Sequence, residues 1–239
     1  MPVRFVHCSS PNHDARPKGM PVDMLVLHYT GMRTSDAALA RLCDPEAKVS
    51  AHYTIDRSGC IYRLVPEDRR AWHAGQSYWA GETNINGRSI GIELVNPGHE
   101  FGYEPFPEAQ IASLTTLSKA ILGRHPIASH RVLGHSDVAP ARKIDPGELF
   151  PWAVLAAEGI GLWPSASVAP EPQIGDWSFA DNLRRFGYGA HPEVDVPAET
   201  VVSAFQRHFR PARIDGVVDA ECEAILAALC GASLTNSGA

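Results

Sequence analysis

One short segment, residues 134–147 (GHSDVAPARKIDPG), gathers side chains that could do chemistry. It places His135, Lys143 and Asp145 among prolines and glycines, which disfavour both a helix and a central strand. Zinc hydrolases commonly hold their ion with three histidine or carboxylate ligands and leave a fourth position to water. The segment therefore reads either as a solvated surface turn or as part of a metal site with a cationic side chain beside it.

Further candidate ligands are scattered along the chain, and their spacing alone does not select among them. The sequence contains no HExxH motif, which would have placed two ligands on one helix. The candidates are His28, His52, His73, His99, His125, His130 and His135, with Asp137 or Asp145 as the carboxylate. Any one of these histidines, taken alone, is more often structural than a ligand.

Two segments are expected to be strands that position such groups. Residues 22–29 (VDMLVLHY) form a continuous apolar run typical of a buried strand, with His28 near its carboxyl end. Residues 89–95 (SIGIELV) alternate, so Glu93 projects from the face opposite the isoleucines. A carboxylate in the middle of a strand is either an ordinary exposed residue or a general base.

The remaining patterns predict an α/β domain built on one mixed central β-sheet flanked by helices. A hairpin is expected over 52–55 and 60–65, because Asp56 and Gly59 supply its turn. Helices are expected over 37–42, capped near Thr34, over 107–123 and over 150–158.

The composition is that of a globular protein with a substantial core, at 44% hydrophobic and 20% charged residues over 239 positions. The formal net charge of −6 and the lack of a lysine- or arginine-rich run argue against a nucleic-acid partner. No apolar run approaches the roughly 20 residues of a membrane span. Five cysteines without a CxxC pair make a disulfide framework unexpected and favour a reducing compartment.

The composition shifts near Trp163, and this shift predicts a division into domains. We expect a catalytic domain over 1–163, a Pro/Ser-rich linker over 164–175, a small helical domain over 176–232 and a tail over 233–239. Three helical patterns, 179–186, 198–209 and 219–229, predict a three-helix module. Its small core indicates an accessory binding module or, alternatively, a helical cap on the first domain.

Five segments together resemble a known family, the zinc-dependent N-acetylmuramoyl-L-alanine amidases that share a fold with T7 lysozyme and the peptidoglycan-recognition proteins. They are LVLHYT (25–30), SAHYTI (50–55), AWHAG (71–75), SIGIEL (89–94) and HSDVAPARKIDPG (135–147). The match is closest to the AmiD branch. The segments FADNLRRFGYG and VVSAFQRHFRPARIDGVVD resemble a peptidoglycan-binding type 1 module, although no clear double repeat is present.

The resemblance implies a role for each matching residue. It implies that His28, His135 and Asp145 bind one Zn²⁺ per chain, that Glu93 is the catalytic glutamate and that Lys143 is the catalytic lysine. The reaction implied is hydrolysis of the amide between the lactyl group of N-acetylmuramic acid and L-alanine, in muropeptides or peptidoglycan. Substrate contacts are expected from four further residues: Tyr29, His52, Trp72 and His73.

Two other functions stay open beside this hypothesis. One is a peptidoglycan-recognition protein without catalysis, and the other is a zinc peptidase or deacetylase acting on a different amide. The start of the sequence has no charged segment followed by an apolar core, which favours the cytoplasm and the recycling of wall fragments. The expected wall-binding module favours the periplasm or cell envelope instead.

Overall fold

A six-stranded mixed sheet forms the centre of the protein, as the sequence predicts. The computed structural model describes residues 5–164 and 177–235, so most of the expected linker and the last part of the expected tail lie outside the described residues. The strand order is β1 (Phe5–His7), β5 (Ile61–Arg63), β4 (Tyr53–Ile55), β7 (Ser89–Leu94), β3 (Met24–Tyr29) and β8 (Val132–Gly134). β4 and β5 pair antiparallel as the expected hairpin, and all other neighbours in this sheet are parallel. β2 (His13–Ala15) and β6 (Arg69–Ala71) form a separate antiparallel pair.

Helices cover both faces of the sheet. Their bounds are α1 (Ser35–Cys43), η1 (Pro45–Ala47), α2 (Ile85–Arg88), α3 (Gly98–Phe101), α4 (Glu108–Leu122), η2 (Ser129–Arg131), α5 (His135–Val138), α6 (Trp152–Ala157), α7 (Phe179–Phe186), α8 (Ala198–Phe209) and α9 (Ala220–Thr235). Thr34 caps α1 as expected, because its hydroxyl accepts a hydrogen bond from the backbone N–H of Ala37. Within the described residues, no helix is long and apolar enough to cross a lipid bilayer.

The segment 134–147 differs from its prediction in one respect, because it begins with the single helical turn α5 rather than with an irregular loop. The prolines that disfavour a helix lie beyond this turn, at Pro140 and Pro146. The backbone N–H of Ser136 donates to the carbonyl of Asp145 over 2.8 Å. The turn is therefore tied to the far end of its own segment.

The two faces of the central strands have different partners. On β3, Leu25 and Leu27 join the cluster formed with α4, whereas Met24 and Val26 belong to a second cluster. Because side chains alternate along a strand, His28 shares the face of Met24 and Val26. The expected alternation of β7 is confirmed, since its isoleucines lie in the first cluster.

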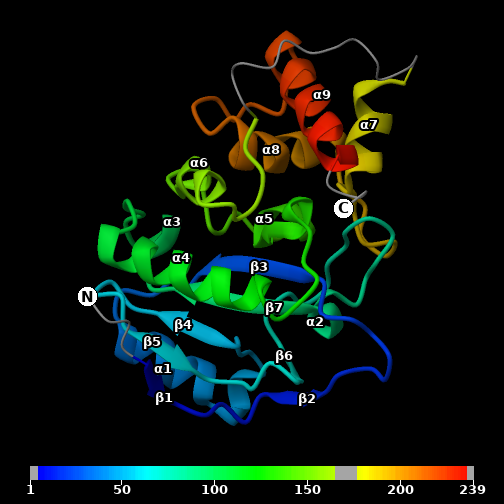
Figure 1. The fold of residues 1–239 in the computed structure, drawn as a ribbon. Coiled ribbons are helices and arrows are strands. Elements are labelled where there is room, and N and C mark those ends of the chain that lie inside the picture. Colours follow the sequence, from blue (N-terminus) through cyan, green and yellow to red (C-terminus); the bar gives the residue numbers. More distant parts are fainter. Residues whose placement is uncertain (1–4, 165–176, 236–239) are drawn as a thin grey trace.

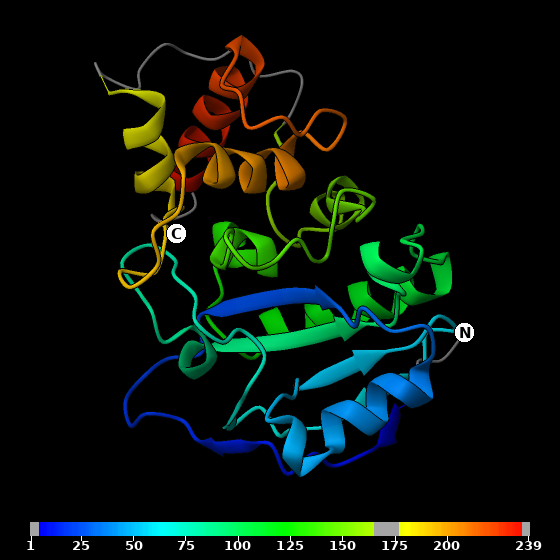
Figure 2. The same cartoon turned by 180° about the vertical axis from the view of Figure 1, so that it is seen from behind.

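The three C-terminal helices share that second cluster. α7 and α8 have the predicted bounds, whereas α9 runs to Thr235, beyond its predicted end at 229. Apolar side chains of α7, α8 and α9, including Leu183, Phe205 and Leu226, form one cluster with Met24 and Val26 of β3. Figures 1 and 2 show α7–α9 gathered at one end of the molecule, with α5 and α6 between them and the sheet. The module therefore does not depend on a small core of its own, because its core continues to one face of the sheet.

Candidate metal centre and active site

Three of the predicted ligands meet at the carboxyl ends of the parallel strands. Nδ1 of His28, on β3, lies 2.9 Å from Nδ1 of His135, which follows β8. Oδ2 of Asp145 lies 3.1 Å from each of these nitrogens. All three side chains are buried. The structure thus selects one histidine–histidine–carboxylate group that could hold a metal ion from the larger set of candidates.

A chain of hydrogen bonds fixes the tautomer of His28. The Ser89 hydroxyl donates to the carbonyl of Ile85 over 2.6 Å, so its oxygen is left to accept from Nε2–H of His73, 3.1 Å away. Nδ1 of His73 then carries a lone pair and accepts from Nε2–H of His28 over 3.0 Å. Nδ1 of His28 is consequently unprotonated and turned toward the centre. Burial and the nearby His135 lower the pKa of His28 to about 4, which also keeps its ring neutral.

His135 is oriented in the same way by a backbone group. Its Nε2–H donates to the carbonyl of Ala74 over 3.1 Å, which leaves the lone pair of Nδ1 facing the centre. The Arg142 guanidinium donates to the same carbonyl over 2.9 Å and so holds it in place. Three electron-pair donors, from His28, His135 and Asp145, therefore face one point at short range. Such an arrangement is repulsive unless a cation lies among them, and anchored rings of this kind are typical of metal ligands.

Glu93 lies beside this group with its carboxylate unpaired. It is the neighbour of His28 in the β3–β7 register, and it is 9% exposed. Among the described residues, its Oε2 is buried and has no hydrogen-bond partner. Burial, reinforced by the charge of Asp145 and opposed by Lys143, raises the pKa of Glu93 to about 8. A carboxyl with a pKa near neutrality can both accept and donate a proton.

A cavity of about 350 Å³ opens onto the candidate metal centre. Glu93, His135 and Asp145 form part of its wall, and Lys143 lines it beside them. The substrate-contact candidates divide: Tyr29 and His73 line the cavity, whereas His52 and Trp72 do not. The role of these four residues in substrate binding stays a prediction.

His52 lies behind His73, in a fully buried position. Its Nδ1 accepts from the backbone N–H of Gly91 over 2.9 Å, and Nε2 contacts Arg16 at 2.9 Å. His73 has two roles, because it lines the cavity and also orients the His28 ring. Ser89 and the Ala74 carbonyl, which anchor the two histidine rings, did not stand out in the sequence, since a lone serine and a backbone carbonyl carry no motif.

The family comparison agrees with this geometry. Residues 18–148 match the family model Amidase_2, described as N-acetylmuramoyl-L-alanine amidase. The chain belongs to this amidase family. The match spans every residue of the candidate centre, from His28 to Asp145.

Curated and solved relatives support the same assignment. The AmiD amidase of Escherichia coli is 42% identical over 230 residues, which cover 87% of this chain and 82% of AmiD. The 1,6-anhydro-N-acetylmuramyl-L-alanine amidase AmpD of Enterobacter cloacae is 35% identical, over 62% of this chain and 86% of AmpD. A solved complex of E. coli AmiD with anhydro-N-acetylmuramic acid-L-Ala-D-gamma-Glu-L-Lys superposes with a TM-score of 0.77 over 91% of each chain, at 40% identity.

Proposed function

We propose that the protein is a zinc-dependent amidase that cuts the bond between the lactyl group of N-acetylmuramic acid and L-alanine in anhydromuropeptides. The observation that carries the proposal is the convergence of three unprotonated ligand atoms beside a buried, unpaired glutamate. Their separations of 2.9–3.1 Å are close to the edge of a tetrahedral zinc site. For bonds of about 2.0–2.1 Å, that edge is about 3.3 Å.

The reaction assigns a separate task to each residue around the cavity. His28, His135 and Asp145 would hold the zinc ion, which when bound supplies a Lewis acid that acidifies water and polarises the scissile carbonyl. Glu93 removes the proton of the attacking water and then delivers it to the leaving nitrogen of L-alanine. The Lys143 ammonium stabilises the negative oxygen that develops on the lactyl carbonyl carbon, as one oxyanion donor commonly does by about 3–4 kcal/mol.

The proposed substrate class draws support from the relatives. E. coli AmiD is described in complex with the substrate anhydro-N-acetylmuramic acid-L-Ala-D-gamma-Glu-L-Lys. AmpDh3 of Pseudomonas aeruginosa, 34% identical, has been solved in complex with an anhydromuramic pentapeptide. The cavity volume of about 350 Å³ lies in the range of ligand pockets and fits part of such a molecule.

The proposal is tested by pairing metal content with product masses. Wild-type protein should release free peptide from an anhydromuropeptide, and a chelator should abolish the release. Asp145→Ala should lose both zinc and activity, whereas Glu93→Gln should keep zinc and lose most turnover. Asp36→Asn, at an exposed position of α1, is the matched control and should change neither. Normal hydrolysis by Asp145→Ala, or products from loss of acetate or a cut within the stem peptide, would contradict the proposal.

We also propose that the C-terminal helices contact the glycan of peptidoglycan. Just before α7, the Trp177 ring is 55% exposed, and the Arg185 guanidinium lies 4.6 Å from its centre. Exposed aromatic rings offer an apolar face that suits sugar rings. Trp177→Ala should weaken co-sedimentation with purified sacculi at unchanged activity toward small muropeptides. Equal co-sedimentation of both proteins would remove this proposal.

A further inference from the structure

The carboxylate of Asp137 is fully buried, two residues after the candidate ligand His135. It accepts three hydrogen bonds from three separate parts of the chain. Oδ2 accepts from the backbone N–H of Gly134 over 2.7 Å and from Nδ1 of His208 over 2.7 Å, and Oδ1 accepts from the Tyr188 hydroxyl over 2.6 Å. A buried carboxylate needs such donors, because an unpaired charge in the interior is costly.

Two of these donors come from the C-terminal helical region. His208 lies in α8, and Tyr188 follows α7. The His208 ring stacks on Trp152 of α6 at a centroid distance of 3.7 Å, which fixes its plane. Among the described residues its Nε2 has no hydrogen-bond partner, so Asp137 is the polar group that holds this ring, through Nδ1.

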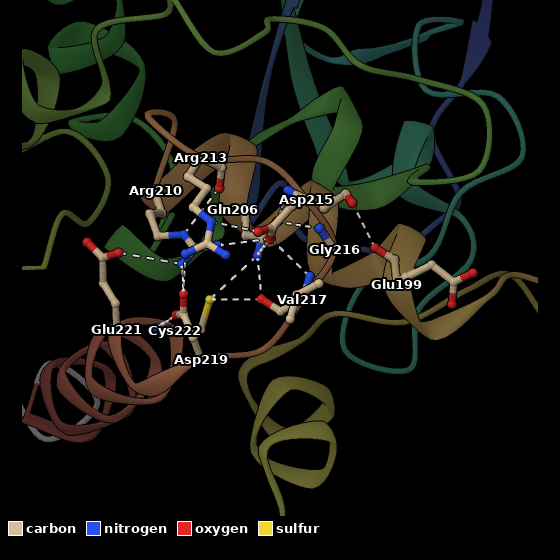
Figure 3. Close-up of polar contacts among 11 residues, drawn as sticks. Glu199, Gln206, Arg210, Arg213, Asp215, Gly216, Val217, Asp219, Glu221 and Cys222 are labelled. Carbon is tan, nitrogen blue, oxygen red and sulfur yellow. Dashed lines mark hydrogen bonds and ion pairs between the residues drawn. The ribbon is translucent and has the colours of Figure 1, made fainter.

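α8 is itself held firmly at the end that carries His208. The Gln206 side chain accepts from the backbone N–H groups of Asp215 and Gly216 at 2.9 and 2.8 Å, and donates to the carbonyl of Val217 at 2.9 Å. The buried Arg210 guanidinium binds the carboxylates of Asp215 and Asp219 (Figure 3). The turn between α8 and α9 is therefore held by hydrogen bonds and ion pairs to side chains at the end of α8.

On the other side, Asp137 acts on the backbone around His135. Its bond to the N–H of Gly134 closes the turn that begins α5, and Gly134 has little freedom to move. A Cβ at that position would lie 2.8 Å from Cδ of Pro146 and 3.4 Å from the Trp152 ring. The path from α8 to the candidate metal centre thus runs through Asp137 and the backbone that joins Gly134 to His135.

We propose that Tyr188 and His208 are positioning residues for the metal centre, which hold Asp137 and through it the turn that carries His135. This inference rests on the proposed zinc site. It makes the C-terminal helices a part of the catalytic unit, in addition to any contact they make with the cell wall. Neither residue lines the active-site cavity, so neither touches substrate.

The test compares full-length variants that remove one donor each. His208→Leu and Tyr188→Phe keep the volume but lose the hydrogen bond, whereas His208→Asn keeps an N–H at the position of Nδ1. Zinc affinity is measured by competition with a chromophoric chelator, without substrate, and kcat and KM are measured on an anhydromuropeptide. His208→Leu should bind zinc about tenfold more weakly, the low end of the effect of removing groups that orient a ligand. The kcat of His208→Leu should fall at unchanged KM. His208→Asn should largely restore both the zinc affinity and kcat.

Controls separate positioning from a general loss of stability. Ser203→Ala removes an exposed hydrogen bond of the same helix, to the Glu199 carbonyl, and should leave zinc affinity unchanged. If His208→Leu fails to fold, the nearly isosteric Tyr188→Phe carries the same expectation. Wild-type zinc affinity in both folded donor-removal variants would overturn the inference, and so would equal losses in His208→Leu and His208→Asn. Failure of the wild-type protein to bind zinc would instead refute the proposed function.

Discussion

Gly91, in the middle of β7, offers a sharp test of how His28 is oriented. A Cβ added there would lie 2.5 Å from Cγ of His73, 2.6 Å from Cδ2 and 2.7 Å from Nδ1. Ordinary contact begins near 3.4 Å, so Gly91→Ala requires the His73 ring to retreat by about 0.9 Å. The ring is buried and hydrogen-bonded on both sides, to His28 over 3.0 Å and to Ser89 over 3.1 Å, so a shift of this size strains or breaks these bonds.

The cost can be worked from these distances. Overpacking a core by one methyl group typically costs about 1–3 kcal/mol, and a lost buried hydrogen bond adds about 1–3 kcal/mol. We therefore expect Gly91→Ala to lower the free energy of unfolding by about 2–6 kcal/mol and to weaken zinc binding. In a His73→Ala background the obstructing ring is absent, so the same substitution should cost less than about 1 kcal/mol.

The assay is urea unfolding of the metal-free protein, completed as a double-mutant cycle between Gly91 and His73. Gly231→Ala is the matched control, because a Cβ at that position of α9 meets no atom within 4 Å. It should be neutral or stabilise by up to about 1 kcal/mol. Equal costs of Gly91→Ala in both backgrounds, or no cost in either, would refute the reasoning about the His73 ring.

Three further predictions concern charge and thiol chemistry. Between about pH 4.5 and 8 the folded metal-free protein keeps a proton on Glu93 that the unfolded chain releases, so the free energy of unfolding falls as pH rises, by at most about 1.4 kcal/mol per unit. In Glu93→Gln, the free energy of unfolding measured with urea should depend less on pH over this range. The same pH dependence in both proteins would contradict a buried, protonated carboxyl at Glu93. Lys143→Met should lower kcat by about 10²–10³-fold with zinc retained, and a change in KM alone would exclude the oxyanion role. The sulfurs of Cys8 and Cys43 lie 3.5 Å apart, so oxidised glutathione should join them and release two glutathione thiols. Peptide mapping should find this link in preference to any with Cys222.

The structure brings together the candidate groups that the family resemblance named, each of which belongs to a recognisable segment. His28 lies near the end of an apolar strand and Glu93 lies on the polar face of an alternating one, so periodicity predicted their placement. The choice of His135 and Asp145 came from the family resemblance. The structure then selects Asp145 over Asp137 as the carboxylate of the group. Spacing could not make that choice, since both aspartates follow His135 closely.

The interactions that orient these groups could not be predicted from the sequence. The tautomer of His28 depends on Ser89 and on the Ile85 carbonyl, and that of His135 on the Ala74 carbonyl; backbone groups have no signature in a sequence. Apolar periodicity predicted the bounds of α7 and α8, whereas α9 continues six residues beyond its predicted end. Periodicity identifies the apolar face of a helix but not the surface that covers it, so it could not choose between a separate module and a helical cap on the first domain.

That shared core limits how such chains can change over evolution. The AmpD relative from Enterobacter cloacae matches only 62% of this chain. A chain shortened after Trp163 would uncover the fully buried ring of Trp79, which packs against Phe186 and Tyr188, and would remove two hydrogen-bond donors from Asp137. We therefore expect loss or gain of the helices over evolution to be accompanied by substitutions at Trp79 and Asp137, so that the residues at these two positions indicate whether a related chain carries the helices.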